Sequence, residues 1–293
     1  MIFDLQELSA ADKQYYLQHV VAPRPVCFAS TIDKEGNVNL SPFSFFNIFS
    51  SNPPVVIFSA ARRVRNNTIK HTLENVMDIP EVVINIVTYD IVQQTSLASC
   101  DYPKGTDEFT KAGFTKEPAT LVKPPMVKES KAKLECKVLE VKSLGENGGA
   151  GQLIICEVLK LHLDKSLLDE NKKFVQENLE LVARLGGDFY CHVSKENLFK
   201  VPKPNTQLGI GIDALPESIR NSKLLTGNHL GMLANVHQMP VIEPSFDDDN
   251  LKNIIQYYSI NPDDMEKELH NYATKLLNEG KVNEAWQVLL STC

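Results

Sequence analysis

The apolar pattern of this chain changes near Val201–Asn205, and the change divides the sequence into two parts. In the first part, apolar runs are short, rich in β-branched and aromatic residues, and bounded by turn signals, which is typical of strands. In the second part, apolar residues recur at helical spacing. We therefore expect a mainly β domain over residues 1–205 and an α-helical C-terminal extension over residues 206–293.

Six long runs and one short segment of the first part predict strands. They are Pro25–Ile32, Val38–Phe49, Pro54–Ala60, Glu81–Thr88, Lys131–Ser143, Leu153–His162 and a short strand within Leu179–Val193. The glycine-rich stretch Gly145–Gly151 predicts a hairpin tip between two of them. Two helices are expected among the strands, Thr68–Met77, capped by Asn66 or Asn67, and Ile91–Ala98. Many strands with few helices favour a barrel over a sheet of βαβ units.

Residues 100–120 show no regular pattern, and the last third predicts three helices, Asp247–Tyr258, Asp263–Glu279 and Val282–Leu290. The two parts also differ in charge. Residues 1–205 carry 24 basic and 25 acidic side chains, a net charge of −1, whereas residues 206–293 carry 6 and 12, a net charge of −6. This acidic balance argues against a nucleic-acid partner. No apolar run approaches the ~20 residues of a membrane helix, so no membrane association is expected.

The six cysteines are widely separated, and no pair has C-x-x-C spacing. Disulfide-rich folds are small and secreted, so reduced thiols fit this chain better. The start, Met1–Lys13, contains no basic segment followed by an apolar one, as a secretory signal would. No histidine has metal-ligand spacing to another His, Cys or carboxylate. We expect a cytoplasmic protein without a metal site.

A cation-rich segment lies between a predicted strand and a predicted helix. It contains Arg62, Arg63, Arg65 and Lys70, and the hydroxyl-bearing Thr72 follows close to the helix start. Free amides at a helix start attract anions, and Arg, Lys and hydroxyl groups complete a phosphate site. A basic loop can also simply face solvent, which is the commoner case for an isolated charge run. The segment is therefore a candidate phosphate site, with a solvated loop as the alternative.

An aromatic run, Ser41–Asn47, leads into a strong turn signal. Strand alternation predicts that Phe43 and Phe45 face one way and Ser44 and Phe46 the other. These side chains could be ordinary barrel core, or they could form a wall for a planar ligand.

Several segments in a fixed order resemble the flavin reductase-like, FMN-binding split-barrel family, which includes flavoredoxin-like proteins. The segments are Pro23-Arg24-Pro25-Val26, Ser41–Phe46 before Ser51-Asn52-Pro53-Pro54, Lys70–Asn75, Val83–Ile86, Asp107-Glu108-Phe109 with Gly113, and Arg184–Gly187 with Tyr190. The resemblance covers residues 1 to about 200 and rests on the order and spacing of these segments together. It departs from the family at one point, because the family's helix usually reads Lys-Asp-Thr and here His71 replaces the acid.

The resemblance implies a homodimer of six-stranded split barrels with one FMN in each of two clefts at the subunit interface. It places the FMN phosphate near Ser59, Ala60, Ala61, Arg62, Lys70 and Thr72. It places the flavin ring along Ser44, Phe45 and Phe46, with Ser30 and Thr31 on the neighbouring strand.

The implied activity is that of an FMN-dependent oxidoreductase, an NAD(P)H:flavin reductase. NADH or NADPH would supply hydride, and a free flavin, a small molecule or a redox protein would accept the electrons. The flavin itself supplies the hydride chemistry, so no catalytic side chain is assigned. Two alternatives stay open: an FMN electron-transfer protein without direct NAD(P)H activity, and a split barrel that has lost its ligand.

Overall fold

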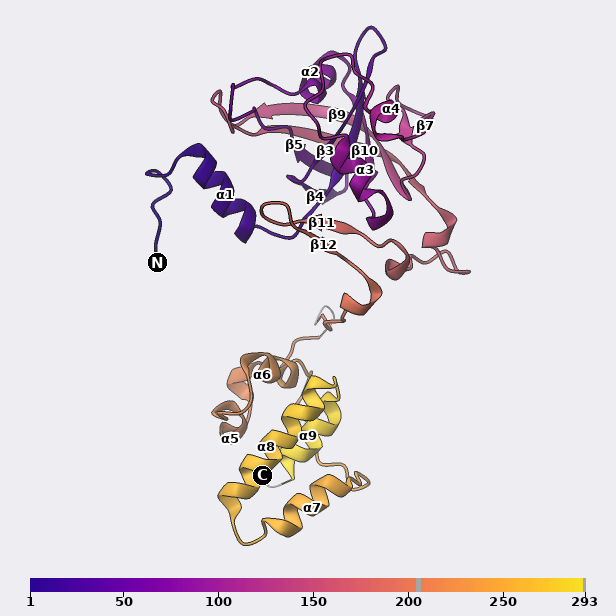
Figure 1. Ribbon diagram of the computed structural model, residues 1–293. Coiled ribbons are helices and arrows are strands. Elements are labelled where there is room, and N and C mark those ends of the chain that lie inside the picture. The colour runs from indigo at the N-terminus through magenta and orange to yellow at the C-terminus, as the bar shows by residue number, and fades with distance from the viewer. Residues whose placement is uncertain (204–206, 292–293) are drawn as a thin grey trace. The chain divides into compact units, whose positions relative to one another are not determined.

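The computed structural model describes residues 1–203 and 207–291, which belong to two compact units, Met1–Phe199 and Lys200–Cys293. All the described strands lie in the first unit, and the second unit is helical (Figure 1). The predicted domain boundary, between residues 205 and 206, lies outside the described residues. No described helix has the length and apolar character that a membrane crossing requires.

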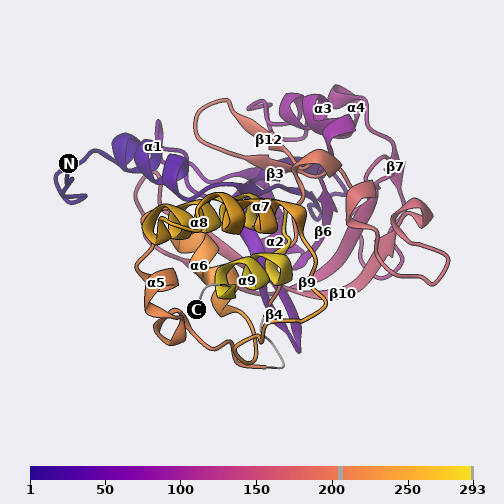
Figure 2. The same ribbon diagram turned by 90° about the horizontal axis from the view of Figure 1, so that it is seen from below.

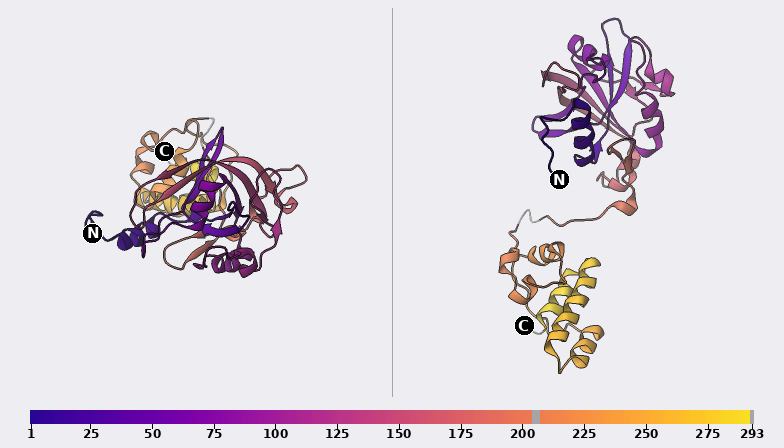
Figure 3. Two further views of the ribbon diagram at one scale, coloured as in Figure 1. Left: turned by 90° about the horizontal axis from the view of Figure 1, so that it is seen from above. Right: turned by 60° about the vertical axis from the view of Figure 1, so that its left-hand side comes forward.

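Seven strands of the first unit form one antiparallel sheet in the order β3-β2-β6-β9-β10-β5-β4. Their bounds are Cys27–Ile32 (β2), Val38–Phe43 (β3), Phe46–Ser51 (β4), Pro54–Ser59 (β5), Glu81–Ile86 (β6), Ala132–Ser143 (β9) and Gln152–Leu163 (β10). The sheet curls on itself, as the view from above shows (Figure 3, left). The fold is thus mainly β, as the sequence predicts.

Short strands and 3₁₀ turns complete the first unit. One small sheet contains β1 (Arg24–Pro25), β11 (Val182–Arg184) and β12 (Tyr190–His192), and β7 (Lys116–Glu117) pairs with β8 (Met126–Val127). The 3₁₀ turns are η1 (Tyr89–Ile91), η2 (Lys165–Leu167), η3 (Gln176–Asn178) and η4 (Lys195–Asn197), and η5 (Ile212–Ala214) belongs to the second unit.

The run expected as one strand over Val38–Phe49 forms two, so the sheet has seven strands where the resemblance implied six. The chain bends at Ser44 and Phe45, between β3 and β4. Phe43 is buried in an apolar cluster and Phe46 packs against the same cluster, whereas Phe45 is 44% exposed. The predicted alternation of these side chains was wrong, because the bend interrupts the two-residue repeat.

Two apolar clusters lie on opposite faces of β2. Cys27 and Ala29 belong to one cluster, which α2 (His71–Asp78) covers with Leu73 and Val76. Phe28 faces the other cluster, together with residues of α3 (Val92–Leu97) and α4 (Glu108–Ala112). Figure 2 shows α3 and α4 next to each other on this side of the unit. Successive side chains of β2 therefore pack alternately into the two clusters.

Two helices of the first unit escaped prediction. The first, α1 (Ala10–Val20), begins after Ser9, whose hydroxyl accepts a hydrogen bond from the Asp12 amide. The second, α4, lies within the stretch of residues 100–120 that was expected to be irregular. Asp107 caps it by accepting from the Phe109 amide, and it ends at Gly113 in the left-handed region. Both caps are sequence signals, but the helices are too short or too polar for periodicity to reveal them.

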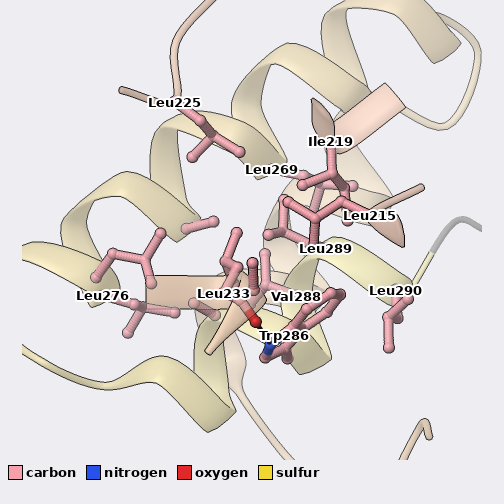
Figure 4. Close-up of a cluster of buried hydrophobic side chains, with 14 of the residues drawn as sticks. Leu215, Ile219, Leu225, Leu233, Leu269, Leu276, Trp286, Val288, Leu289 and Leu290 are labelled. Carbon is pink, nitrogen blue, oxygen red and sulfur yellow. Dashed lines mark hydrogen bonds between the residues drawn. The ribbon is translucent and has the colours of Figure 1, made fainter. Parts of the chain in front are cut away.

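The second unit has its own core. Its helices are α5 (Glu217–Arg220), α6 (Gly227–Ala234), α7 (Asp249–Tyr257), α8 (Pro262–Asn278) and α9 (Val282–Leu290). Trp286 is fully buried, and its Nε1 donates a hydrogen bond to the Leu233 carbonyl at 3.2 Å (Figure 4). The three predicted helices correspond to α7, α8 and α9, whereas the short α5 and α6 were not predicted.

Candidate functional site

A cleft of about 860 Å³ lies in the first unit, lined by α1, by the loop after β5 and by the tip of the β9–β10 hairpin. Its described lining contains six cationic side chains and one carboxylate, that of Asp101. The cations are Lys13, Arg24, Arg62, Arg63, Arg65 and Lys70. The chain as a whole carries a net charge of −7, so this cleft concentrates positive charge on an otherwise acidic protein.

The cations differ in how strongly the protein already engages them. Arg63 and Arg65 both form ion pairs with Asp101, so their charge is partly neutralised. Arg62 donates to the side-chain and main-chain oxygens of Asn67, each at 2.7 Å, and meets no carboxylate among the described residues. It therefore keeps its full charge for an anion in the cleft.

Lys70, like Arg62, forms no ion pair with a carboxylate among the described residues. Its Nζ lies 5.7 Å from the centre of the Phe43 ring, a cation–π contact. Burial, and next the positive charge of Arg63, lower the pKa of Lys70 below its usual range. An anion bound beside it would stabilise the ammonium form.

Helix α2 begins directly after Lys70, and its start differs from the predicted one. The helix was expected from Thr68 with Asn66 or Asn67 as its cap, whereas it begins at His71 with Lys70 as the N-cap residue. Arg62 and Arg63 hold the preceding residues in a turn through Asn67 and Thr68. The amides of Leu73 and Glu74 donate to the Lys70 carbonyl. Lys70 provides no side-chain acceptor, so the amides of His71 and Thr72 remain for another acceptor.

The glycine-rich hairpin tip was predicted only as a connection between two strands. In the structure it also closes one side of the cleft. The Gly149 amide donates to the Arg62 carbonyl at 3.0 Å, and the Arg62 amide donates to the Ala150 carbonyl at 2.9 Å. A Cβ atom at Gly148 would lie 2.9 Å from the Val64 carbonyl oxygen. Glycine at this position therefore lets the tip pack directly against the cationic loop.

A second groove, of about 610 Å³, adjoins the cleft and shares Val21, Arg24 and Phe45 with it. Phe45 projects where the chain bends between β3 and β4. The predicted ring-wall residues Ser44 and Phe46 line this second groove. The structure thus places an aromatic wall directly beside the cation-rich cleft.

Of the eleven predicted site residues, four line the main cleft and three line only the second groove. The cleft residues are Phe45, Ala61, Arg62 and Lys70, and the groove residues are Ser44, Phe46 and Ser59. The remaining four, Ser30, Thr31, Ala60 and Thr72, are buried away from both cavities. Thr31 and Thr72 accept hydrogen bonds from Asn75 and Asn39, so their hydroxyls serve packing between α2 and the sheet.

Sequence reasoning gave no role to several residues that shape the cleft. Arg24 was part of a quoted motif without an assigned function, and Asp101 and Lys13 were not considered. Lys13 was missed together with α1, although Ser9 and Asp12 form a recognisable helix start. No sequence pattern marks Asp101 as a site residue, because only the fold brings it to Arg63.

The first unit is an antiparallel barrel, and its cleft combines cations with an aromatic wall. These features are those of a ligand-binding β protein. Residues 20–178 match the family model of the Flavin reductase like domain, which is more than half of the chain. The chain belongs to the flavin reductase-like family, and the predicted family is confirmed.

Known proteins support the same assignment. An uncharacterised protein of Aquifex aeolicus is 36% identical over 182 residues, which cover 62% of this chain and 90% of that protein. The structure of nitrilotriacetate monooxygenase component B from Bacillus cereus superposes with a TM-score of 0.64 at 27% identity, covering 69% of this chain and 98% of that one. A candidate flavin reductase with a split-barrel domain from Shewanella frigidimarina gives a TM-score of 0.59 at 27% identity, covering 69% and 99%. The first unit is a flavin reductase-like split barrel, as predicted, and α5–α9 lie beyond the aligned region.

Proposed function

We propose that this chain binds FMN in the cationic cleft and acts as an FMN-dependent oxidoreductase. The observation that carries the proposal is the meeting of six cations and one carboxylate with the exposed face of Phe45 in a single cleft. FMN combines the two matching features, a phosphate ester with up to two negative charges and a planar ring. Cations and uncapped helix amides stabilise the phosphate, and an aromatic wall packs against the ring.

In this proposal, Arg62, Lys70 and the first amides of α2 hold the phosphate. The ring extends along Phe45 towards the second groove, where Ser44 and Phe46 lie. Bound FMN supplies the hydride chemistry, and the protein supplies position and electrostatics. His71 takes the place of the acid that usually follows the lysine in this family, so no carboxylate stands at the first position of α2.

The reaction that we propose is that of an NAD(P)H:flavin reductase. NADH or NADPH reduces bound FMN, and the electrons pass to a free flavin, a small molecule or a redox protein. Rapid anaerobic mixing of the FMN-loaded protein with each nucleotide tests this activity. We expect the absorption of oxidised flavin to bleach with at least one nucleotide. Absence of bleaching with both, together with reduction by a protein donor, would favour the FMN electron-transfer alternative.

The proposal includes a homodimer in which a second copy covers the edge of the sheet at β4. This edge strand exposes Ile48 and Phe49, at 65% and 64%, and Val20 and Val21 are exposed beside the second groove. Exposed apolar edge strands are normally covered by a partner. A copy seated here would close the second groove over the ring.

We expect Ile48→Asp to convert the dimer to a monomer and to weaken FMN binding at least tenfold, because a buried charge at the interface is strongly unfavourable. Light scattering after gel filtration gives the oligomeric state, and fluorescence titration gives the FMN affinity. Leu161→Asp is the matched control, since Leu161 is a strand residue with 54% exposure and lies outside both grooves. A dimer that survives Ile48→Asp would contradict this interface.

Deletion of residues 206–293 should leave a folded core that still binds FMN. The apolar clusters of the first unit contain no residue of the second, and the cleft is lined by first-unit residues alone within the described part of the chain. Circular dichroism and FMN titration of the shortened protein check this expectation. Loss of both structure and binding would show that the helical extension completes the barrel or the dimer.

We also propose a cytoplasmic location. The five cysteines that the structure describes are free thiols, and three of them are buried in the barrel. Free thiols are typical of a reducing compartment. The acidic net charge of the chain is consistent with small-molecule and protein partners and does not favour nucleic acid.

A further inference from the structure

Arg24 is a buried cation that connects three parts of the first unit. The residue is only 7% exposed. Its Nη1 donates to the carbonyl oxygens of Gln18 (2.6 Å) and Val21 (2.7 Å), at the end of α1. Its Nη2 donates to the Leu185 carbonyl (2.9 Å), in the turn between β11 and β12, and its Nε approaches the Ser44 hydroxyl at 3.5 Å.

All of these partners are neutral, so the charge of Arg24 has no counter-ion. Among the described residues, no carboxylate forms an ion pair with it. Its cross-strand neighbour in the β1–β11 pair is another cation, Arg184, and like charges placed directly opposite destabilise a sheet. Burial, and next Arg184, lower the pKa of Arg24 below its usual range. A buried, uncompensated cation is costly unless an anion joins it.

The position of this cation relates it to the flavin ring of the proposed function. Arg24 and Phe45 line both the cationic cleft and the adjoining groove. The guanidinium carbon lies 5.9 Å from the centre of the Phe45 ring. A flat ligand along Phe45 would therefore have Arg24 close to it, and Arg24 also lines the second groove, which neither Arg62 nor Lys70 lines.

Reduction changes the charge of that ligand. Hydride transfer from NAD(P)H to FMN gives NAD(P)⁺ and FMNH⁻: two electrons and one proton enter the ring, and one negative charge remains on it. A fixed cation beside the ring stabilises this product more than it stabilises the neutral oxidised ring. The phosphate carries the same charge in both forms and does not change this difference.

We propose that Arg24 supplies the positive charge that selectively stabilises reduced FMN in this protein. The proposal rests on FMN being the ligand of the cleft. It assigns to Arg24 an electrostatic role in addition to holding α1 and the β11–β12 turn in place.

Two substitutions separate the charge from the hydrogen bonds. Arg24→Met removes both, whereas Arg24→Lys keeps the charge and loses most of the bonds to Gln18, Val21 and Leu185. The dissociation constants of oxidised and reduced FMN are measured anaerobically for each protein. We expect Arg24→Met to raise the ratio of the reduced to the oxidised constant about tenfold, equivalent to about 30 mV for a two-electron couple. Arg24→Lys should stay within about threefold of the wild-type ratio.

Lys128→Met is the matched control, because Lys128 is an exposed cation of the first unit that lines neither the cleft nor the second groove, and its loss should leave the ratio unchanged. An unchanged ratio in Arg24→Met, or equal shifts in the Met and Lys variants, would overturn the electrostatic role while leaving FMN binding intact. Failure of the wild-type protein to bind FMN in either form would instead overturn the proposed function, and this inference with it.

A measurement on the unmodified protein keeps the proposal testable if the Arg24 variants do not fold. We expect the absorption spectrum of bound reduced FMN to remain that of the anion at a pH at which free reduced FMN is already protonated. A spectrum that protonates in parallel with free reduced FMN would contradict the role of Arg24.

Discussion

Replacing Arg62 and Lys70 together by alanine should weaken FMN binding by at least about a hundredfold. Each charge-assisted hydrogen bond to phosphate contributes about 1.5–3 kcal/mol, and 1.4 kcal/mol corresponds to a tenfold change in affinity. These are the two cations beside the start of α2 that no described carboxylate neutralises. Quenching of FMN fluorescence during titration measures the dissociation constant.

Arg65→Ala provides the control for this experiment. The Arg65 side chain is 68% exposed and is bound to Asp101, so its loss should change FMN affinity by less than about threefold. An unchanged affinity in the double variant would move the phosphate site away from α2. An equal loss in the control would mean that only the summed charge of the cleft matters.

Replacing Glu135 by glutamine should destabilise the first unit by about 3 kcal/mol. The Glu135 carboxylate is fully buried in β9 and accepts hydrogen bonds from the amides of Thr120, Leu121 and Val122. It also contacts His162 Nε2 at 2.6 Å. A glutamine removes the charge and brings its own N–H groups against these donors, which leaves buried groups unsatisfied.

The single tryptophan allows the unfolding of the two units to be followed separately. Trp286 lies in the second unit, so its fluorescence follows the unfolding of that unit in urea. Circular dichroism of the β signal follows the first unit. We expect Glu135→Gln to lower the urea midpoint of the β signal and to leave the tryptophan transition unchanged. A common shift of both transitions would show that the two units unfold together.

The same carboxylate predicts how the stability of the first unit depends on pH. Burial by itself would raise the pKa of Glu135, but the hydrogen bonds from Thr120, Leu121 and His162 outweigh burial and lower this pKa from 4.5 to about 2. A lowered folded-state pKa means that the stabilisation is complete above pH 4.5 and is lost as the pH falls towards about 2. The shift corresponds to about 3 kcal/mol, and this part of the acid sensitivity should be absent in Glu135→Gln.

The mainly β first part and the helical extension could be predicted because both depend on local periodicity. Strands such as β5 and β6 are continuous apolar runs, and α8 has a clear start at Pro262. The cationic loop and Phe45 could be identified as site candidates because charge runs and aromatic runs are visible in the sequence.

What sequence reasoning missed depends on contacts between distant segments. Thr72 was expected in the site because it follows Lys70, but it lies outside the cleft and its hydroxyl accepts a hydrogen bond from Asn39 on β3 at 2.8 Å. The bend at Ser44 and Phe45 brings Phe43 and Phe46 to the same apolar cluster and leaves Phe45 exposed, which strand alternation does not predict. Arg24 acquires its partners from α1 and from Leu185, 161 positions away along the chain. None of these relations has a signature within a short window of sequence.

A crystal structure of the protein grown with FMN would locate both the phosphate and the flavin ring. We expect the FMN phosphate within hydrogen-bond distance of Arg62, Lys70 and the first amides of α2, with the ring against Phe45. FMN bound elsewhere, with Arg62 still joined to Asn67 and the cleft free of ligand, would contradict this expectation.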